Sequence, residues 1–213
     1  MKTIAFILLC FAWIFPYTMP AQTATQPAGS GTASGPYQIA NLENLYWVTQ
    51  NNSSWDKCFI QTANINASAT ATWDDNSGFT PIGDSATPFT GSYDGQGSMI
   101  DGLTISRNTT DYVGLFGKIY NGVVKNIQID NATITGDNFV GILAGMVQGN
   151  SAMVDVCYTS GVVSGNNLVG GCVGYNVFSV SLEGCGSTAL VTVLNDERGL
   201  SGCRRYVYRF LYQ

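Results

Sequence analysis

The chain has 213 residues, room for one or two domains, and carries few charges: 11% of its residues are charged, histidine is absent and the formal net charge is −5. Binding to nucleic-acid phosphates needs clustered Lys and Arg, whereas the segment 22–194 holds only Lys57, Arg107, Lys118 and Lys125 against a clear excess of acids. The composition therefore excludes nucleic acid as an expected partner and fits a protein that works outside the cell.

The segment 1–21 has the pattern of a secretory signal peptide. A short basic start precedes an apolar run, Ile4–Phe15, which prolines end. The run is too short to cross a bilayer as a helix, and Ala21 supplies a small residue before a cleavage point at Gln22. We expect this segment to be removed and the mature chain, which has no later apolar stretch of transmembrane length, to be secreted or held at the cell surface.

The next two segments predict a linker and a cap. Residues 22–36 are uncharged and consist mainly of Gly, Ser, Thr, Ala and Pro, which is typical of a flexible linker. Residues 37–60 contain an approximate helical stripe, formed by Ile39, Leu42, Leu45, Tyr46 and Val48. A short helix here could cover the end of a stack of strands, which would otherwise be an exposed sheet edge. We assign residues 37–90 to an N-terminal cap and first coils.

Glycines become dense from Phe89 onward. Phe89–Ile105 contains Gly91, Gly95, Gly97 and Gly102, a density that marks tight corners. Ile100–Ser106 resembles Val124–Asp130, further along the chain. We interpret this stretch as an earlier coil with a shorter connection.

Three later segments can be laid on one another: Val113–Gly136, Val140–Gly165 and Val169–Val193. Each begins with a Val-Gly cluster and runs through a turn into a β-rich stretch, and the three starts are almost evenly spaced. A nearly fixed period in the range of roughly 20–50 residues is typical of a solenoid, in which stacking buries the apolar face that one repeat cannot bury alone. The sequence therefore predicts an all-β fold, a parallel β-helix with a possible short N-terminal capping helix.

Partial alternation predicts which side chains face inward. Ile127, Ile129, Ala132 and Ile134 fit an inward face if the chain turns a corner near Asn131. The second repeat does not follow the same parity, because Cys157 falls in the column of Gln128, so the coil register stays open.

Cysteines are odd in number after the signal peptide, which rules out complete pairing within the chain. Cys157 and Cys185 stand at matching positions of neighbouring repeats. Stacked strands lie roughly 5 Å apart, so a disulfide between these two cysteines is geometrically feasible. The alternative is a ladder of small buried side chains.

Residues 195–213 break the repeat pattern. Glu197 and Arg198 fall at apolar and glycine positions, and four of the nine basic residues of the chain lie in this tail. The tail is either a cap, a decayed repeat or the product of a frameshift.

The repeats resemble the GLUG-repeat family of bacterial secreted and cell-surface proteins. The resemblance is carried by Val140–Gly145, Cys157–Gly165 and Val169–Gly174, with a typical lead-in at Pro88–Gly97, and we assign residues 91–194 to such repeats. It implies a right-handed parallel β-helix and an adhesin-like or matrix-associated role. Some relatives carry a zinc peptidase, but a chain without histidine cannot form the usual two-His zinc motif.

Three groups of residues are candidates for chemistry or ligand binding, and two of them contain carboxylates. Asp155 and Glu183 match in the repeats, and stacked carboxylates could serve as acid and base in glycoside cleavage; the alternative is a solvated corner. Asp74 and Asn76 offer alternating oxygen ligands for calcium, although Asx-rich turns are common without metal.

Aromatic residues form a third group. Tyrosines and tryptophans could stack on sugar rings, although the tryptophans near the N-terminus are better explained as packing of the cap. The residues are Trp47, Trp55, Trp73, Tyr93, Tyr112, Tyr120, Tyr158 and Tyr175.

These patterns favour an exported surface repeat module, adhesin-like and without catalytic activity, which binds an extracellular glycan or a matrix or surface protein and needs no cofactor. The competing hypothesis is a carbohydrate-active enzyme on the same fold, a polysaccharide hydrolase or lyase that would use Asp155 and Glu183.

Overall fold

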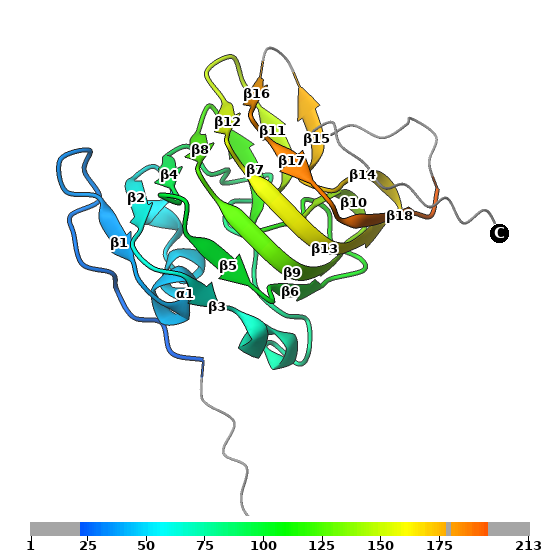
Figure 1. The fold of residues 1–213 in the computed structure, drawn as a ribbon, viewed down its shortest axis with the longest axis horizontal. Helices are drawn as coiled ribbons and strands as arrows, with labels where there is room; N and C mark the ends of the chain where they lie inside the picture. Colours follow the sequence, from blue (N-terminus) through cyan, green and yellow to red (C-terminus); the bar gives the residue numbers. More distant parts are fainter. Residues whose placement is uncertain (1–21, 178–179, 196–213) are drawn as a thin grey trace, which may run out of the picture.

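The computed structural model describes residues 22–177 and 180–195. The predicted signal peptide and nearly all of the off-pattern tail lie outside these residues. The described chain is built of parallel strands stacked coil upon coil, with one short α-helix near its N-terminal end (Figure 1). The predicted all-β parallel β-helix with a short N-terminal helix is therefore confirmed.

Each full coil contributes strands to three faces, and every pairing between the named strands is parallel. Face 1 consists of β1 (Tyr37–Ile39), β2 (Cys58–Gln61), β4 (Ser92–Asp94), β8 (Val123–Lys125), β12 (Met153–Asp155) and β16 (Ser181–Glu183). Face 2 consists of β3 (Ile65–Asn66), β5 (Met99–Asp101), β6 (Thr104–Ser106), β9 (Gln128–Thr135), β13 (Tyr158–Gly165), β17 (Gly186–Ser187) and β18 (Leu190–Val193). Face 3 consists of β7 (Phe116–Tyr120), β11 (Ala144–Gln148) and β15 (Val173–Val177), approached by the pair β10 (Asn138–Gly141) and β14 (Asn167–Gly170).

The Val-Gly clusters of the three repeats lie directly next to one another in adjacent coils. Val113 forms a parallel bridge with Val140, and Val140 pairs with Val169. The glycines after Val113 and Val140 leave room for the neighbouring coil: a Cβ on Gly114 would lie 2.5 Å from the carbonyl oxygen of Gly141, and one on Gly141 would lie 2.6 Å from the backbone nitrogen of Gly174. The sequence alignment of the three repeats is thus confirmed, and the glycines explain why the cluster recurs.

The proposed alignment of Ile100–Ser106 with Val124–Asp130 is wrong. Ile100 pairs with Ile129 on face 2, whereas Val124 belongs to face 1 and pairs with Tyr93. Ile100–Ser106 covers β5 and β6 of face 2, whereas Val124–Asp130 runs from β8 of face 1 into the start of β9 on face 2, so the two stretches are displaced along the coil.

The inward column of β9 is confirmed, and the open register is resolved. Ile127, Ile129, Ala132 and Ile134 are each at most 1% exposed. Gln128 pairs with Tyr158, so Cys157 lies in the column of Ile127 and its burial obeys the same parity.

The predicted corner at Asn131 is a β-bulge within the long strand β9. Two residues of β9, Asp130 and Asn131, stand opposite the single residue Ser160 of β13. Asn131 has a φ of 53°, in the left-handed region that Asn tolerates better than most residues. The extra residue shifts the alternation by one, which keeps the apolar side chains inside on both sides of the bulge.

The core is aliphatic in the later coils and aromatic toward the N-terminal end. Buried Ile, Val, Leu and Ala side chains fill the interior between β9 and β15, whereas Phe59, Phe89, Tyr93 and Phe116 pack together beneath the first coils. Tyr93 is fully buried, and its hydroxyl donates to the Oε1 atom of Gln61 at 3.3 Å. Large rings therefore close the N-terminal part of the core.

The helix α1 (Leu42–Gln50) covers the N-terminal coils, as the apolar stripe predicted (Figure 1). The Asn41 side chain caps it by accepting the backbone N–H of Asn44 at 2.9 Å. Leu45 and Val48 are fully buried. Two 3₁₀ helices, η1 (Asn52–Ser54) and η2 (Ser68–Thr72), complete this end. Within residues 22–177 and 180–195, no helix has the length and apolar character needed to cross a membrane.

Residues 22–36 are held against the cap in place of the expected flexible linker. The backbone N–H of Thr25 donates to Glu43 on the helix at 3.1 Å, and Gly31 accepts the N–H of Cys58 at 2.9 Å. Ala28 bridges Gln38 in antiparallel fashion. Small residues suit this path because they let the backbone approach closely: a Cβ on Gly29 would lie 2.2 Å from the carbonyl oxygen of Pro36.

Candidate functional site

The two carboxylates considered as an acid–base pair lie on adjacent strands of face 1. Asp155 of β12 pairs directly with Glu183 of β16, as their spacing predicts. Lys125 of β8 stands opposite Asp155 on the other side, and the Ser181 hydroxyl donates to Glu183 at 2.9 Å. The two acids are thus brought together, with backbones about 5 Å apart by the spacing of paired strands. Neither of them lines the hollows described below.

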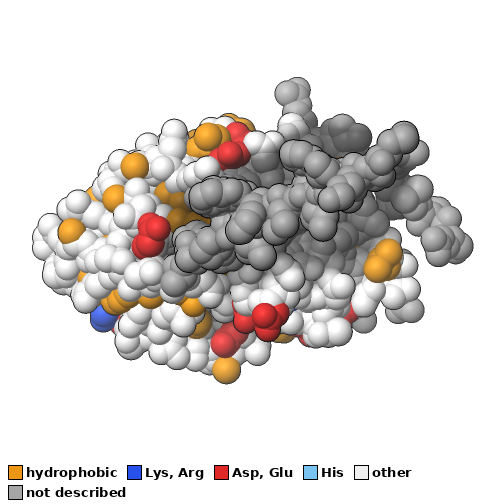
Figure 2. All heavy atoms as spheres, turned by 90° about the horizontal axis from the view of Figure 1, so that it is seen from below, with side chains coloured by type: hydrophobic (Ala, Val, Ile, Leu, Met, Phe, Trp, Pro, Cys, Tyr) orange, Lys and Arg blue, Asp and Glu red, His pale blue; other side chains and the backbone are white. Residues whose placement is uncertain are grey.

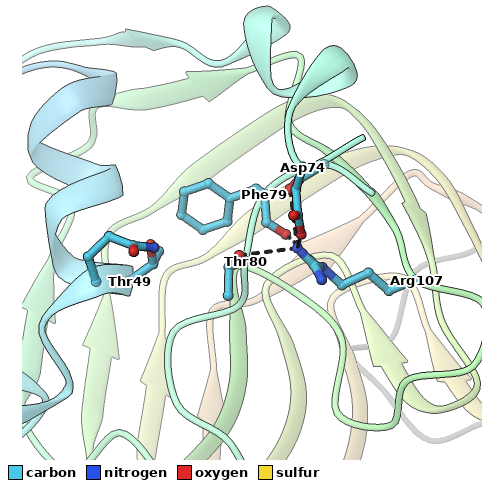
Figure 3. Close-up of polar contacts among 7 residues, drawn as sticks. Thr49, Asp74, Phe79, Thr80 and Arg107 are labelled. Carbon is cyan, nitrogen blue, oxygen red and sulfur yellow. Dashed lines mark hydrogen bonds and ion pairs between the residues drawn. The ribbon is translucent and has the colours of Figure 1, made fainter. Parts of the chain in front are cut away.

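The Asp-rich turn proposed for calcium is held by an arginine. Nη2 of Arg107 lies 2.7 Å from the Asp74 carboxylate and 3.1 Å from the Thr80 hydroxyl (Figure 3). A guanidinium therefore already neutralises Asp74, one of the two proposed ligands with Asn76. The described residues contain no group of three His, Cys, Asp or Glu side chains that could hold a metal ion. Calcium binding here stays a prediction.

Cys157 and Cys185 occupy equivalent positions on neighbouring coils. They lie between two pairs in the same register, Asp155 with Glu183 and Tyr158 with Gly186. The sulfur of Cys157 lies 3.3 Å from the Asp155 carbonyl oxygen, and that of Cys185 lies 3.2 Å from the Glu183 carbonyl oxygen. The placement agrees with the sequence alignment, and the disulfide itself stays a prediction.

The structure sorts the candidate aromatic residues by burial. The three tryptophans pack the cap: Trp55 donates its ring N–H to the Val48 carbonyl at 2.8 Å, the Trp73 ring lies 4.9 Å from that of Tyr46, and Trp47 contacts Tyr37. The prediction that they serve the cap is confirmed. Among the tyrosines of the described residues, only Tyr120 and Tyr158 are exposed, by 41% and 53%.

Tyr112 belongs to a ladder of rings at the entrance to face 3. Its ring stacks on Phe139 of the next coil with centroids 4.8 Å apart and an interplanar angle of 3°, and Phe139 contacts Tyr175. Tyr112, Phe139 and Leu168 stand at equivalent coil positions, and all have left-handed φ values between 56° and 60°. These half-buried rings therefore cover strained corners of the stack, which accounts for them structurally.

Tyr158 lies between two hollows on the outer surface of face 2. The first, of about 540 Å³, extends toward face 1 and is lined by Asp94, Gln96, Gly97, Asn126, Ile127, Gln128, Val156 and Tyr158. The second, of about 410 Å³, extends over β13 and β17 and is lined by Asp130, Tyr158, Thr159, Ser160, Gly186, Ser187 and Thr188. We call the two hollows and the ring between them the Tyr158 groove.

A hydrogen-bond network orders the side chains beside Tyr158. The Gln128 amide nitrogen donates to Oδ2 of Asp130 at 2.7 Å, and the Ser160 hydroxyl donates to Oδ1 at 3.0 Å. Ser160 in turn accepts the backbone N–H of Asn131, the bulge residue, at 3.2 Å. The bulge thus holds three polar side chains of two coils together in one network.

Asp94 lines the first hollow at the corner between faces 1 and 2. Its carboxylate accepts 2.9 Å hydrogen bonds from the Asn126 amide and the Gln96 backbone N–H, and it lies 3.3 Å from Nζ of Lys125. Burial alone would raise the pKa of Asp94, but these hydrogen bonds and Lys125 outweigh it and hold the pKa below its ordinary value of 3.8. The groove therefore keeps a negative charge at neutral pH.

Sequence reasoning included Tyr158 among the aromatic candidates but missed Gln128, Asp130 and Ser160. The sequence could not single out Tyr158 as a binding residue, because it does not show which aromatic rings are exposed and which are buried. The polar neighbours depend on the bulge at Asn131, and the broken alternation near this residue was the available signal.

Comparison with known proteins finds two similar sequences. Halomucin from Haloquadratum walsbyi is 42% identical over 152 residues, which are 68% of this chain and 2% of Halomucin. A putative Gly-rich membrane protein from Evansella cellulosilytica is 33% identical over 158 residues, 71% of this chain and 18% of that protein. The chain thus spans less than a fifth of the length of either relative. No protein-family model matches the chain, and no solved structure gives a significant match.

Proposed function

We propose that this chain is an exported surface module of GLUG-type repeats that binds an extracellular glycan or a matrix or surface protein. The observation that carries the proposal is that uncharged polar side chains repeat from coil to coil on the outer side of face 2. Ser106 pairs with Thr135, Thr135 with Ser164, and Ser164 with Thr192. Such a column presents one hydroxyl group on each coil at regular intervals, which suits a binding partner with a repeating structure.

The low surface charge supports the same role. In the view of Figure 2, most of the described surface is uncharged, acidic side chains are scattered and basic ones are sparse. The names of the relatives also support it, since one is described as a putative membrane protein. A match to small parts of much longer relatives suits a display module, because coils of a solenoid interact only with their neighbours.

Two measurements test the proposal. Cells that produce an epitope-tagged chain should carry the tag outside, where added protease removes it without lysis. Beads coated with the full chain should be retained on immobilised polysaccharides or matrix proteins more strongly than albumin-coated beads, with no release of sugar or peptide products. Retention of the tag inside the cell, or bead retention equal to albumin on every surface, would contradict the proposal.

The second candidate function is a carbohydrate-active enzyme, favoured by the direct pairing of Asp155 with Glu183. If the pair were catalytic, the chain would release reducing sugars from a polysaccharide and Asp155→Asn would abolish that release. Unchanged turnover in this variant would remove the pair as catalytic residues. We favour the binding module because neither acid lines either hollow of the Tyr158 groove.

A further inference from the structure

Tyr158 presents an aromatic ring to solvent between two polar hollows. Its side chain is 53% exposed, and the neighbouring Val156 is 42% exposed. Its partner on the next coil is Gly186, where a Cβ would lie 3.2 Å from two ring carbons. The ring therefore lies over a position without a side chain, and no neighbouring side chain at that position restricts access to it.

The residues around the ring are polar and mostly uncharged. Among the described residues, two acids, Asp94 and Asp130, and no basic residue line the two hollows. Lys125 beside them is engaged with Asp94 at 3.3 Å. A polyanionic ligand such as a uronate or sulfated chain would meet net repulsion here. An apolar peptide would remove the remaining hydrogen-bonding capacity of the amides and carboxylates from water without replacing it.

The groove offers the two contacts that a sugar ring requires. The C–H face of a pyranose packs on an aromatic ring, and its hydroxyls form hydrogen bonds with planar amides and carboxylates. The amide of Gln128 uses one N–H to reach Asp130, so its carbonyl oxygen and second N–H retain hydrogen-bonding capacity. The Ser160 and Asn131 contacts hold this network before any ligand arrives, which lowers the entropy lost on binding.

We propose that the Tyr158 groove binds a neutral glycan chain that crosses the ring and occupies both hollows. Tyr158 supplies the stacking surface, and Gln128 and Asp130 supply the hydrogen bonds to the sugar hydroxyls. The net negative charge of Asp94 and Asp130 against the single Lys125 disfavours anionic chains. This inference rests on the proposed binding role and names its site and ligand class.

The test uses the full chain and a panel of hexasaccharides. The neutral probes are β-1,4-linked glucose, xylose, mannose and N-acetylglucosamine, and the anionic probe is hexagalacturonate. Affinities are measured by isothermal titration calorimetry. We expect at least one neutral probe to bind, and Tyr158→Ala to weaken it about tenfold or more, equivalent to about 1.4 kcal/mol. Tyr158→Phe should retain most of the affinity, because the stacking surface is kept.

Tyr120→Ala is the matched control. Tyr120 is 41% exposed and lines a separate hollow with Asn121, Gln148 and Gly149, so its removal should leave glycan affinity unchanged. Thermal unfolding of both variants should match that of the parent chain, since both side chains are exposed. Absence of binding to every neutral probe, equal affinity in Tyr158→Ala, or tighter binding of hexagalacturonate would each overturn the inference.

The bead experiment separates failure of the site from failure of the module. If no neutral hexasaccharide binds while chain-coated beads are still retained on matrix proteins, the glycan site is wrong and the binding role stands. If beads are not retained on any surface and no probe binds, both proposals fail.

Discussion

Arg107, which follows β6, forms hydrogen bonds and an ion pair with the segment that follows Trp73. Its guanidinium contacts the Asp74 carboxylate at 2.7 Å, the Thr80 hydroxyl at 3.1 Å and the Gly78 carbonyl oxygen at 3.4 Å, and its side chain is only 19% exposed (Figure 3). Hydrogen bonds to a charged donor contribute more than neutral ones, and loss of the donor leaves several acceptors unpaired.

Replacement of Arg107 should therefore destabilise the fold. We expect Arg107→Ala to lower the free energy of unfolding by about 1–3 kcal/mol in urea titrations. Lys57→Ala is the control: Lys57 pairs with Asp56 at 3.0 Å, but both side chains are largely exposed, by 44% and 59%, so the expected loss is at most about 1 kcal/mol. Equal losses in the two variants would show that Arg107 is only a surface ion pair.

Asp94 makes the stability of the fold depend on pH in the acidic range. Because its pKa in the folded state lies below the ordinary value of 3.8, the ionised form is favoured by folding. This contribution is fully present above the pKa of the unfolded state and is lost as the pH falls through the folded pKa. We expect the unfolding free energy to decline below pH 4 less steeply in Asp94→Asn than in the parent, measured by urea titrations between pH 5 and pH 2. Parallel declines would contradict the assignment.

The bulge between β9 and β13 requires a glycine on the facing strand. Gly161 of β13 faces the bulge with a φ of 130°, and a Cβ there would lie 2.1 Å from the carbonyl oxygen of Ala132. A side chain at position 161 would therefore be disfavoured both by the φ angle and by overlap with the backbone of β9. The glycine therefore permits the close pairing of the two longest described strands, and with it the polar network at Asp130.

Gly161→Ala should destabilise the fold far more than the same substitution at a glycine that has a left-handed φ but no close neighbours. We expect Gly161→Ala to lower the unfolding free energy by at least about 3 kcal/mol, because strain and overlap with backbone atoms add. Gly97→Ala is the matched control: Gly97 has a φ of 75°, but nothing lies within 4 Å of its Cβ position, so only the conformational cost of about 1 kcal/mol applies. Chemical denaturation gives both values, and similar losses would show that backbone angle alone decides.

The strands of the later coils could be predicted from sequence, but their register could not. Repeated Val-Gly clusters have one physical cause, close approach of adjacent coils, so Val113, Val140 and Val169 align without knowledge of the structure. The coils differ slightly in length, however, and the bulge at Asn131 adds a residue within a strand. The alignment of Ile100–Ser106 with Val124–Asp130 failed because it assumed a shorter connection, whereas Ile100 and Ile105 pair with Ile129 and Ile134.

The candidate site was predictable only in part for the same reason. Asp155 and Glu183 lie at equivalent positions of the short strands β12 and β16, which pair without a bulge. Their pairing could therefore be predicted from their spacing in the sequence. Exposure of Tyr158 depends on which parity its strand adopts, and the sequence alignment placed Cys157 one position away from its true column. Residues 22–36 illustrate a second limit, because small residues permit both a free linker and a closely packed path along the cap.

At the scale of the whole molecule, each coil is stabilised by the coils on either side of it. β9 is paired with β5 and β6 on one side and with β13 on the other. Within the described residues, β18 pairs with β13 alone, and its Val191 remains 8% exposed. In a stack with only nearest-neighbour contacts, terminal coils can open while central ones persist.

Amide hydrogen exchange should therefore follow a gradient along the stack. We expect the amides of β9 to exchange only through global unfolding and those of β16 to β18 through local opening at lower free energy. Ile129→Ala, which removes a fully buried central side chain, should lower the global free energy by about 2–5 kcal/mol and accelerate exchange throughout the coils. Val191→Ala should accelerate exchange in β18 and leave β9 unchanged. Uniform protection from β9 to β18, or a response of β9 to Val191→Ala, would mean that the coils unfold as one unit, so that coupling across the whole stack outweighs the weaker pairing of its last coil.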